Sequence, residues 1–67
     1  MDDQDAYSVR KFAKRHDLSP GFVYAEWRAG RGPRYMQVGD RRIISREAAS
    51  DYRRELEAAT LAARRVA

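Results

Sequence analysis

The sequence predicts a single domain of the mainly α class that also contains a small β-hairpin. Two serines each stand directly before a short segment with helical periodicity, which is the place of a helix N-cap. Further along, a glycine and an aspartate separate two short runs of strand-like composition. In the last third, apolar residues recur alternately three and four positions apart, as they do on one face of a long helix.

The first helix is expected from Val9 to about His16, with Ser8 as its N-cap. One face of this segment is apolar and includes Phe12, which has the spacing of a hydrophobic staple with Tyr7. The remaining positions are basic and are expected to point away from the core.

The second helix is expected to begin after Ser19 and to stop at Gly30. Ser19 is a suitable N-cap, and Pro20 stands at the first helical position, where its missing N–H costs no hydrogen bond. Gly30 suits a left-handed C-cap, and the following Gly32-Pro33 prevents continuation. Two short helices joined by a tight turn give a helix-turn-helix layout.

Two short strands are expected around Gly39-Asp40, a two-residue hairpin turn. Ser45 then caps a third helix, whose apolar seam is of heptad type but weak, because half of it is alanine. Helical to Arg65, it would span roughly 30 Å, which is more than a domain of this size needs.

The expected organisation is therefore a disordered acidic leader over 1–6, a folded domain over 7–57 and a C-terminal helix extension over 58–67. The extension either frays or docks on a neighbouring subunit. We expect cooperative, filament-like self-association along a shared partner, because contacts between adjacent copies strengthen binding that is weak for each copy alone. The residues expected at such an intersubunit contact are Leu56, Leu61 and Val66.

The composition excludes several classes of function. The 67 residues include no cysteine and a single histidine, His16, so neither a disulfide nor a zinc site of the usual ligand type is expected. No apolar run approaches the roughly 20 residues of a membrane span, and the acidic start lacks the features of a signal peptide. We expect a soluble cytoplasmic protein that needs no cofactor.

An enzyme is not expected either. His16 lies on the predicted core side, and none of the carboxylates sits in an apolar setting that would tune its pKa.

Positive charge is concentrated in the middle of the chain. The net charge of +4 divides into −3 for residues 1–7, +7 for residues 8–46 and zero for residues 47–67. Arginine outnumbers lysine twelve to two, and its planar fork suits phosphate and guanine edges. Arginine-favouring codon usage is an alternative explanation of that ratio, but it does not explain the clustering. A basic block inside a folded domain is typical of a nucleic-acid binder.

The second helix is expected to turn one stripe inward and a face of small residues outward. Val23 and Trp27 share the inward stripe, with Pro20 beside them. We interpret Trp27 as core, with base stacking as the alternative. The residues expected at the DNA major groove, including the capping serine, are Ser19, Gly21, Phe22, Tyr24, Ala25 and Arg28.

Small residues let the helix backbone approach the bases, while Arg28 can reach a guanine edge and Ala25 a thymine methyl group. The alternative is an ordinary solvated face, on which Phe22 is one of the scattered apolar residues that every surface carries.

The hairpin tip has a parallel interpretation. Asp40, Arg41 and Arg42 either form a solvated turn or enter the neighbouring minor groove, whose negative potential attracts arginine; we favour the groove. Other cations are expected to neutralise phosphates rather than to read sequence. They are Arg10, Lys11, Lys14, Arg15, Arg31 and Arg34.

Several motifs between residues 7 and 56 also match a known group. They are the Ser19-capped helix with Val23-Tyr24, the exit Gly30-Arg31-Gly32-Pro33, the turn at Val38-Gly39 followed by arginines, and a third helix that opens "SREAASDY". With these features the chain resembles the small winged helix-turn-helix proteins of the excisionase and AlpA/MerR-like group.

The resemblance implies a winged helix with its second helix in the major groove and its wing in the minor groove. It also implies binding beside an attachment site of a phage or mobile element, DNA bending, and a partner integrase directed towards excision. The related AlpA-like proteins regulate transcription, which is the alternative role. A protein–protein module such as an anti-repressor is a further alternative.

The sequence departs from this group at two positions of the second helix. Members usually carry an arginine or polar residue at the Ala25 position and a large apolar residue at the Glu26 position. Glu26 either accepts a hydrogen bond from a cytosine amine or forms a surface pair with a nearby arginine, and we favour the pair.

Overall fold

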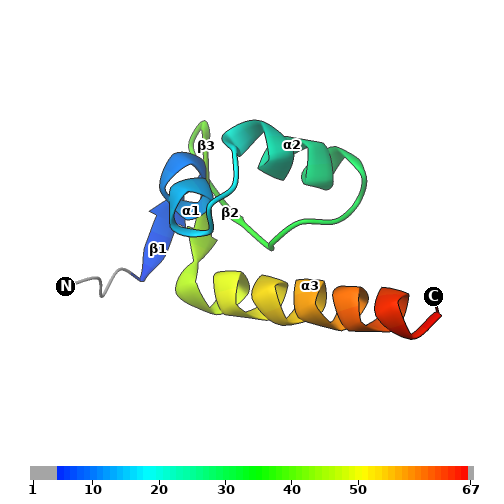
Figure 1. Ribbon diagram of the computed structural model, residues 1–67. Helices are drawn as coiled ribbons and strands as arrows, with labels where there is room; N and C mark the ends of the chain where they lie inside the picture. The colour runs from blue at the N-terminus through cyan, green and yellow to red at the C-terminus, as the bar shows by residue number, and fades with distance from the viewer. Residues whose placement is uncertain (1–4, 67) are drawn as a thin grey trace.

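The structure is a computed structural model that describes residues 5–66, the side chain of Val66 excepted. These residues form three helices and one three-stranded antiparallel sheet (Figure 1). Helices α2 and α3 lie on opposite sides of the molecule, with α1 and the sheet joining them. In chain order the elements are β1 (Ala6–Ser8), α1 (Val9–Arg15), α2 (Pro20–Arg28), β2 (Met36–Val38), β3 (Arg41–Ser45) and α3 (Arg46–Val66).

The sheet has one strand more than the sequence predicts. Strand β3 lies in the middle and pairs with β2 on one side and with β1 on the other. In the register of β1, Tyr7 stands opposite Ile44, and the carbonyl oxygen of Asp5 accepts a hydrogen bond from the backbone N–H of Arg46 at 2.7 Å. The expectation of a disordered leader over 1–6 is therefore wrong for Asp5 and Ala6; residues 1–4 lie outside the described part.

All three predicted N-caps are confirmed. The hydroxyl of Ser8 accepts from the N–H of Lys11 at 3.2 Å, and that of Ser19 accepts from the N–H of Phe22 at 3.1 Å. Ser45 caps α3 by accepting from the N–H of Ala48 at 3.0 Å. Each bond satisfies a donor that the first turn of a helix leaves unpaired.

The predicted end of α2 is also confirmed. Gly30 has a φ of +82°, the left-handed conformation that glycine adopts without a Cβ penalty. Its N–H donates to the carbonyl of Trp27 at 3.0 Å, and the next N–H, of Arg31, donates to the carbonyl of Glu26 at 2.8 Å. This pair of bonds is a Schellman motif, which closes the helix and turns the chain towards the hairpin.

The hairpin has the predicted two-residue turn. Val38 pairs with Arg41, so that Gly39 and Asp40 alone form the tip. Gly39 has a φ of +63° while Asp40 does not have a positive φ, which is the pattern of a type II′ turn. The turn fixes which side chains of β3 face the helices.

The core lies where α1, α2 and β3 meet. Phe12, Val23 and Ile44 are its largest fully buried side chains, one from each of these elements. Trp27 packs against this cluster but is only partly buried, so it forms the edge of the core. Pro20, expected beside the inward stripe, is exposed.

Helix α3 covers the core with its first half and leaves it with its second. Ala48, Ala49 and Tyr52 are buried, whereas residues 53–65 are all exposed. Figure 1 shows the last turns of α3 extending past the rest of the fold. No helix within residues 5–66 combines the length and the apolar character that a membrane span requires.

The residues expected at an intersubunit contact lie on this extension. Leu56 and Leu61 are exposed and line a shallow groove on α3 together with Glu57, Thr60 and Arg64. The side chain of Val66 lies outside the described part of the chain. Self-association through the extension stays a prediction.

Candidate nucleic-acid interface

The outward face of α2 is exposed as predicted. Gly21, Ala25 and Arg28 are all accessible, and the flanking rings of Phe22 and Tyr24 are 41% and 42% exposed. The hydroxyl of the remaining member of this set, Ser19, is used for the N-cap. Because the cap fixes the first turn, the exposed side chains project from a well-defined helix.

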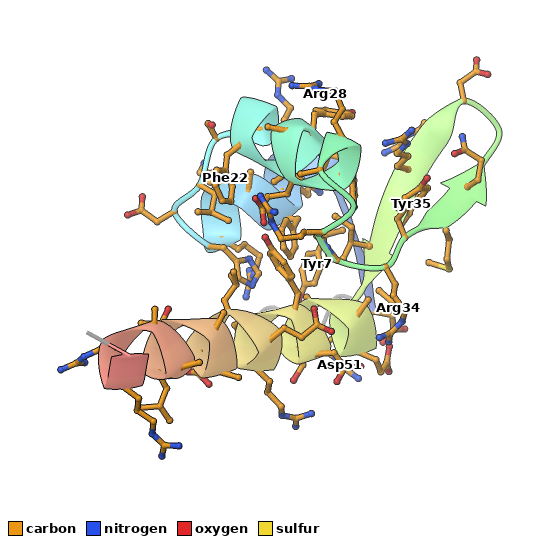
Figure 2. All side chains as sticks on the ribbon, turned by 90° about the vertical axis from the view of Figure 1, so that its right-hand side faces the viewer. Tyr7, Phe22, Arg28, Arg34, Tyr35 and Asp51 are labelled. Atoms are coloured by element: carbon orange, nitrogen blue, oxygen red, sulfur yellow. The ribbon has the colours of Figure 1, made fainter. Side chains whose placement is uncertain are left out.

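The tip of the β2–β3 hairpin lies beside α2 and the start of α1. A cleft of about 450 Å³ is lined by side chains of all three elements. It brings together Arg10 from α1, Tyr24 from α2 and Arg41 from β3. Figure 2 shows α2 and the hairpin on the side of the molecule away from α3, with Arg28 at the outer edge of α2.

Exposed cations stand on all three of these elements. Arg10, Lys11 and Lys14 are exposed on α1, and Arg28 and Arg41 are exposed on α2 and β3. Within residues 5–66, none of these five forms a salt bridge with a carboxylate. Their charges are therefore not neutralised by that part of the chain. The fourth cation of α1, Arg15, is also exposed, and its guanidinium lies 5.5 Å from the centre of the Tyr7 ring.

Two members of the predicted phosphate-contacting set, both with exposed side chains, have carboxylate partners. Arg34 forms an ion pair of 3.0 Å with Asp51 of α3, and Figure 2 shows the two side chains together at that helix. Arg31 pairs with Glu26 at 3.1 Å. Arg31 and Arg34 thus differ from the other exposed cations in having a carboxylate partner, and their contact with phosphates stays a prediction.

Glu26 is buried, which the sequence analysis did not predict. Only 9% of the residue is exposed, although it was expected in a surface pair. The hydroxyl of Tyr52 donates to its Oε1 at 3.0 Å, and the guanidinium of Arg31 donates to its Oε2 at 3.1 Å. Because Glu26 is buried and both of its oxygens have partners inside the protein, the pairing interpretation holds in a buried form.

The pKa values of this cluster are shifted in ways that favour the observed charges. The hydrogen bond from Arg31 lowers the pKa of the Glu26 carboxyl below its usual value of 4.5. Burial, followed by the bond to Glu26, raises the pKa of Tyr52 to about 12. No carboxylate was expected in an apolar setting that would tune its pKa; Glu26 is buried and its pKa is shifted, but chiefly by the hydrogen bond from Arg31. Glu26 is a structural anchor between α2 and α3, because its carboxylate accepts from Tyr52 of α3 and from Arg31.

The position of Arg42 differs from the prediction that its side chain lies at the hairpin tip. Its side chain is half-buried, and its guanidinium lies 4.7 Å from the centre of the Tyr35 ring and 5.0 Å from that of Trp27. Its neighbours Asp40 and Arg41 are exposed. Of the three predicted tip residues, Asp40 and Arg41 are exposed, whereas Arg42 is half-buried against the rings and also lines the cleft beside the tip.

Tyr35 was not among the predicted site residues, because it stands in an irregular segment that has no periodicity to place it. The inward position of Arg42 could have been predicted. Side chains two residues apart on a strand share a face, so Arg42 lies on the same face as the buried Ile44.

Comparison of the chain with protein-family models, with curated proteins and with solved structures finds no match. The arrangement itself defines a small domain with an exposed helix face and a hairpin tip on one side, and with cations around both.

Proposed function

We propose that the protein binds double-stranded DNA as a winged helix-turn-helix domain. Helix α2 would enter the major groove, and the β2–β3 hairpin would act as the wing at the adjacent minor groove. The observation that carries the proposal is the shared placement of the exposed α2 face and the hairpin tip, with Arg10, Arg28 and Arg41 lacking carboxylate partners within residues 5–66. A basic surface of this kind attracts a phosphate backbone.

The shape of the α2 face supports the same proposal. Glycine and alanine at positions 21 and 25 leave the helix backbone accessible, so that it can approach base edges in a groove about 12 Å wide. Arg28 is exposed and can form a bidentate contact with a guanine. Arg41 at the tip would contact the minor groove, and Lys11 and Lys14 would contact phosphates.

In the finer form of the proposal, the protein is an excisionase-like architectural factor. It would bend DNA beside an attachment site, act with an integrase, and self-associate along the duplex through α3. Support comes from the resemblance of the segment 7–56 to that group and from the exposed extension of α3. An AlpA-like regulator would use the same residues. A circular-permutation assay separates the two, because the architectural role requires a bent complex.

The salt dependence of DNA affinity tests the proposal. For binding through several phosphates, log K falls linearly with log salt, with a slope of about −0.9 per phosphate contact. We expect a steep slope for the wild type and a slope shallower by about one for Arg41→Ala. Arg34→Ala removes the same charge from the α3 side and is expected to keep the wild-type slope; it should fold, because an exposed ion pair contributes only about 0–1 kcal/mol.

A protein–protein module is the second candidate, favoured by the exposure of Phe22 and Tyr24. That function predicts no measurable DNA binding, or weak DNA binding that salt hardly changes. Either result would overturn the DNA-binding proposal.

A further inference from the structure

A half-buried arginine lies among three aromatic rings between α2 and the hairpin. Tyr24 and Trp27 of α2 and Tyr35, which precedes β2, form what we call the aromatic cage. The guanidinium carbon of Arg42 lies 4.7 Å from the ring centre of Tyr35, 5.0 Å from that of Trp27 and 6.0 Å from that of Tyr24. All three distances are within the range of a cation–π interaction.

The cage is held in place by its own contacts. The Trp27 ring lies 4.8 Å from the Tyr35 ring and meets the Tyr24 ring edge-on at 5.4 Å between centres. The indole N–H of Trp27 donates to the carbonyl oxygen of Pro33 at 2.8 Å. The cage therefore has a defined geometry before any partner binds.

Gly32 makes this packing possible. Its φ is +97°, and a Cβ at this position would stand only 2.6 Å from Cδ1 of Trp27. Only glycine combines that conformation with so close an approach to the indole.

Strand register explains why Arg42 and not Arg41 reaches the cage. Arg42 shares a strand face with Ile44, which enters the core, whereas the intervening residue faces the other way. Arg41 belongs to that opposite face and is exposed. Two adjacent arginines thus have different surroundings, one enclosed by rings and one in solvent.

No carboxylate lines the cleft that Arg42 shares with the three rings, although Asp40 lines the neighbouring cleft, which Arg42 also reaches. The side chains that line the shared cleft are Tyr24, Trp27, Arg28, Tyr35 and Arg42 itself. Within residues 5–66, Arg42 forms no salt bridge with a carboxylate, so the rings are the contacts that hold its charge.

The contact joins two elements whose backbones make little close approach. Helix α2 packs against α1, and the hairpin continues the sheet, so the side chains of the cage provide a direct link between them. In a complex with DNA, the distance between α2 and the hairpin tip must match the distance between a major groove and the adjacent minor groove. Fixing that distance in the free protein reduces the ordering cost of binding.

We infer that Arg42 is a positioning residue that fixes the hairpin against α2 through the aromatic cage, while Arg41 alone of the two carries the minor-groove contact. The role of Arg41 at the minor groove rests on the proposed DNA-binding function. The contact between Arg42 and the aromatic cage can be measured without DNA.

The first measurement uses the fluorescence of Trp27, the single tryptophan of the chain. Arg42→Ala is expected to shift the emission of the free protein, because it removes a cation 5.0 Å from the indole ring. Arg41→Ala is the matched control and should leave the emission unchanged. Circular dichroism of each variant confirms that the helices are intact. Unchanged emission in folded Arg42→Ala would overturn the cage, whatever the protein binds.

The second measurement uses DNA affinity as a function of salt. Arg42→Ala is expected to weaken binding about 3- to 30-fold, the range that the loss of a cation–π contact gives, with the wild-type salt slope retained. Arg41→Ala should make the salt slope shallower by about one. If both variants make the salt slope shallower by the same amount, Arg42 contacts DNA itself, and the positioning role is overturned. If the wild type does not bind DNA, the proposed function fails, and the fluorescence result still decides the cage.

A double-mutant cycle completes the test. Tyr35→Ala removes one wall of the cage, so Tyr35→Ala combined with Arg42→Ala should weaken DNA binding no more than Arg42→Ala alone. Fully additive losses would show that the two residues act independently and would overturn the inference.

Discussion

The α3 side and the α2–hairpin side of the molecule use arginine differently. On the α3 side, two guanidinium groups from the loop between α2 and β2 have carboxylate partners. Arg34 pairs with Asp51 of α3, and Arg31 pairs with Glu26, which also accepts from Tyr52 of α3. These contacts tie the loop between α2 and β2 to the last helix.

On the α2–hairpin side, Arg10, Arg28 and Arg41 are exposed and form no salt bridge with a carboxylate of residues 5–66. The exception there is Arg42, which is enclosed by rings rather than neutralised by an acid. Charge that is left without a counterion is available to a polyanion, whereas charge that is paired internally contributes to the fold.

The comparison shows that the positions of the carboxylates matter more than the net charge of +4. Carboxylates such as Glu26 and Asp51 lie where they neutralise nearby arginines, and they leave the opposite side positive. Mutations should therefore separate the two sides. Changes on the α3 side should affect the stability of the protein, and changes on the α2–hairpin side should affect DNA binding.

The largest effect is expected from Tyr52, at the centre of the α3 side. Tyr52→Ala removes a ring that is almost fully buried, which costs about 3–5 kcal/mol in comparable cores. A domain of this size has a total stability of the same order, so the variant should be largely unfolded at room temperature. Circular dichroism measures this directly.

Tyr52→Phe is the matched change, because it keeps the ring and removes only the hydroxyl that donates to Glu26. It is expected to lower the free energy of unfolding by about 1–3 kcal/mol, and to lower the Tm by about 4–8 °C for each kcal/mol. DNA affinity, measured well below the Tm, should equal that of the wild type. A several-fold loss of affinity in folded Tyr52→Phe would mean that the two sides are coupled.

A smaller effect, on binding alone, is expected from Arg28 on the opposite side. Arg28→Ala should cost about 1–3 kcal/mol of affinity for the preferred sequence, because a bidentate contact with a base is lost. It should weaken binding to other sequences much less, so that sequence preference is reduced. Competition binding with the preferred and a scrambled duplex measures both.

Arg41→Ala is the comparison for Arg28→Ala. Its loss should be uniform across sequences, since a minor-groove arginine at the hairpin tip reads little sequence. If both variants lose affinity equally and keep the wild-type preference, then Arg28 does not read bases. The thermal stability of both should stay close to that of the wild type, as for most surface substitutions.

Local signals in the sequence predicted most of the fold. Each helix start depends on a serine, and the end of α2 depends on Gly30; cap and turn chemistry acts over three or four residues and can be read directly. Strand β1 was missed because three residues beside an N-cap are too short to show alternation.

The site was predictable where helical periodicity alone decided it. The exposed face of α2 followed from the position of Val23, but the burial of Glu26 depends on Tyr52, which is 26 residues away, and no spacing reveals such a contact. The position of Arg42 could have been inferred from the predicted turn at Gly39-Asp40, because a two-residue turn fixes the strand register and places Arg42 on the face of Ile44. The contact of Arg42 with the Tyr35 ring could not have been inferred from the sequence.

The most limited effect is expected at alkaline pH, again on the α3 side. Burial, and then the neighbouring Glu26 carboxylate, raise the pKa of Tyr52 from 10 to about 12, so the folded protein keeps the phenol proton over a range in which the unfolded chain releases it. This contribution to stability is fully present below pH 10 and is lost as the pH rises through about 12. The advantage of the wild type over Tyr52→Phe in free energy of unfolding should therefore shrink across this interval. Urea titrations of both proteins at several pH values measure it, and an advantage that stays constant from pH 10 to 12 would show that the pKa of Tyr52 is not raised in the folded protein.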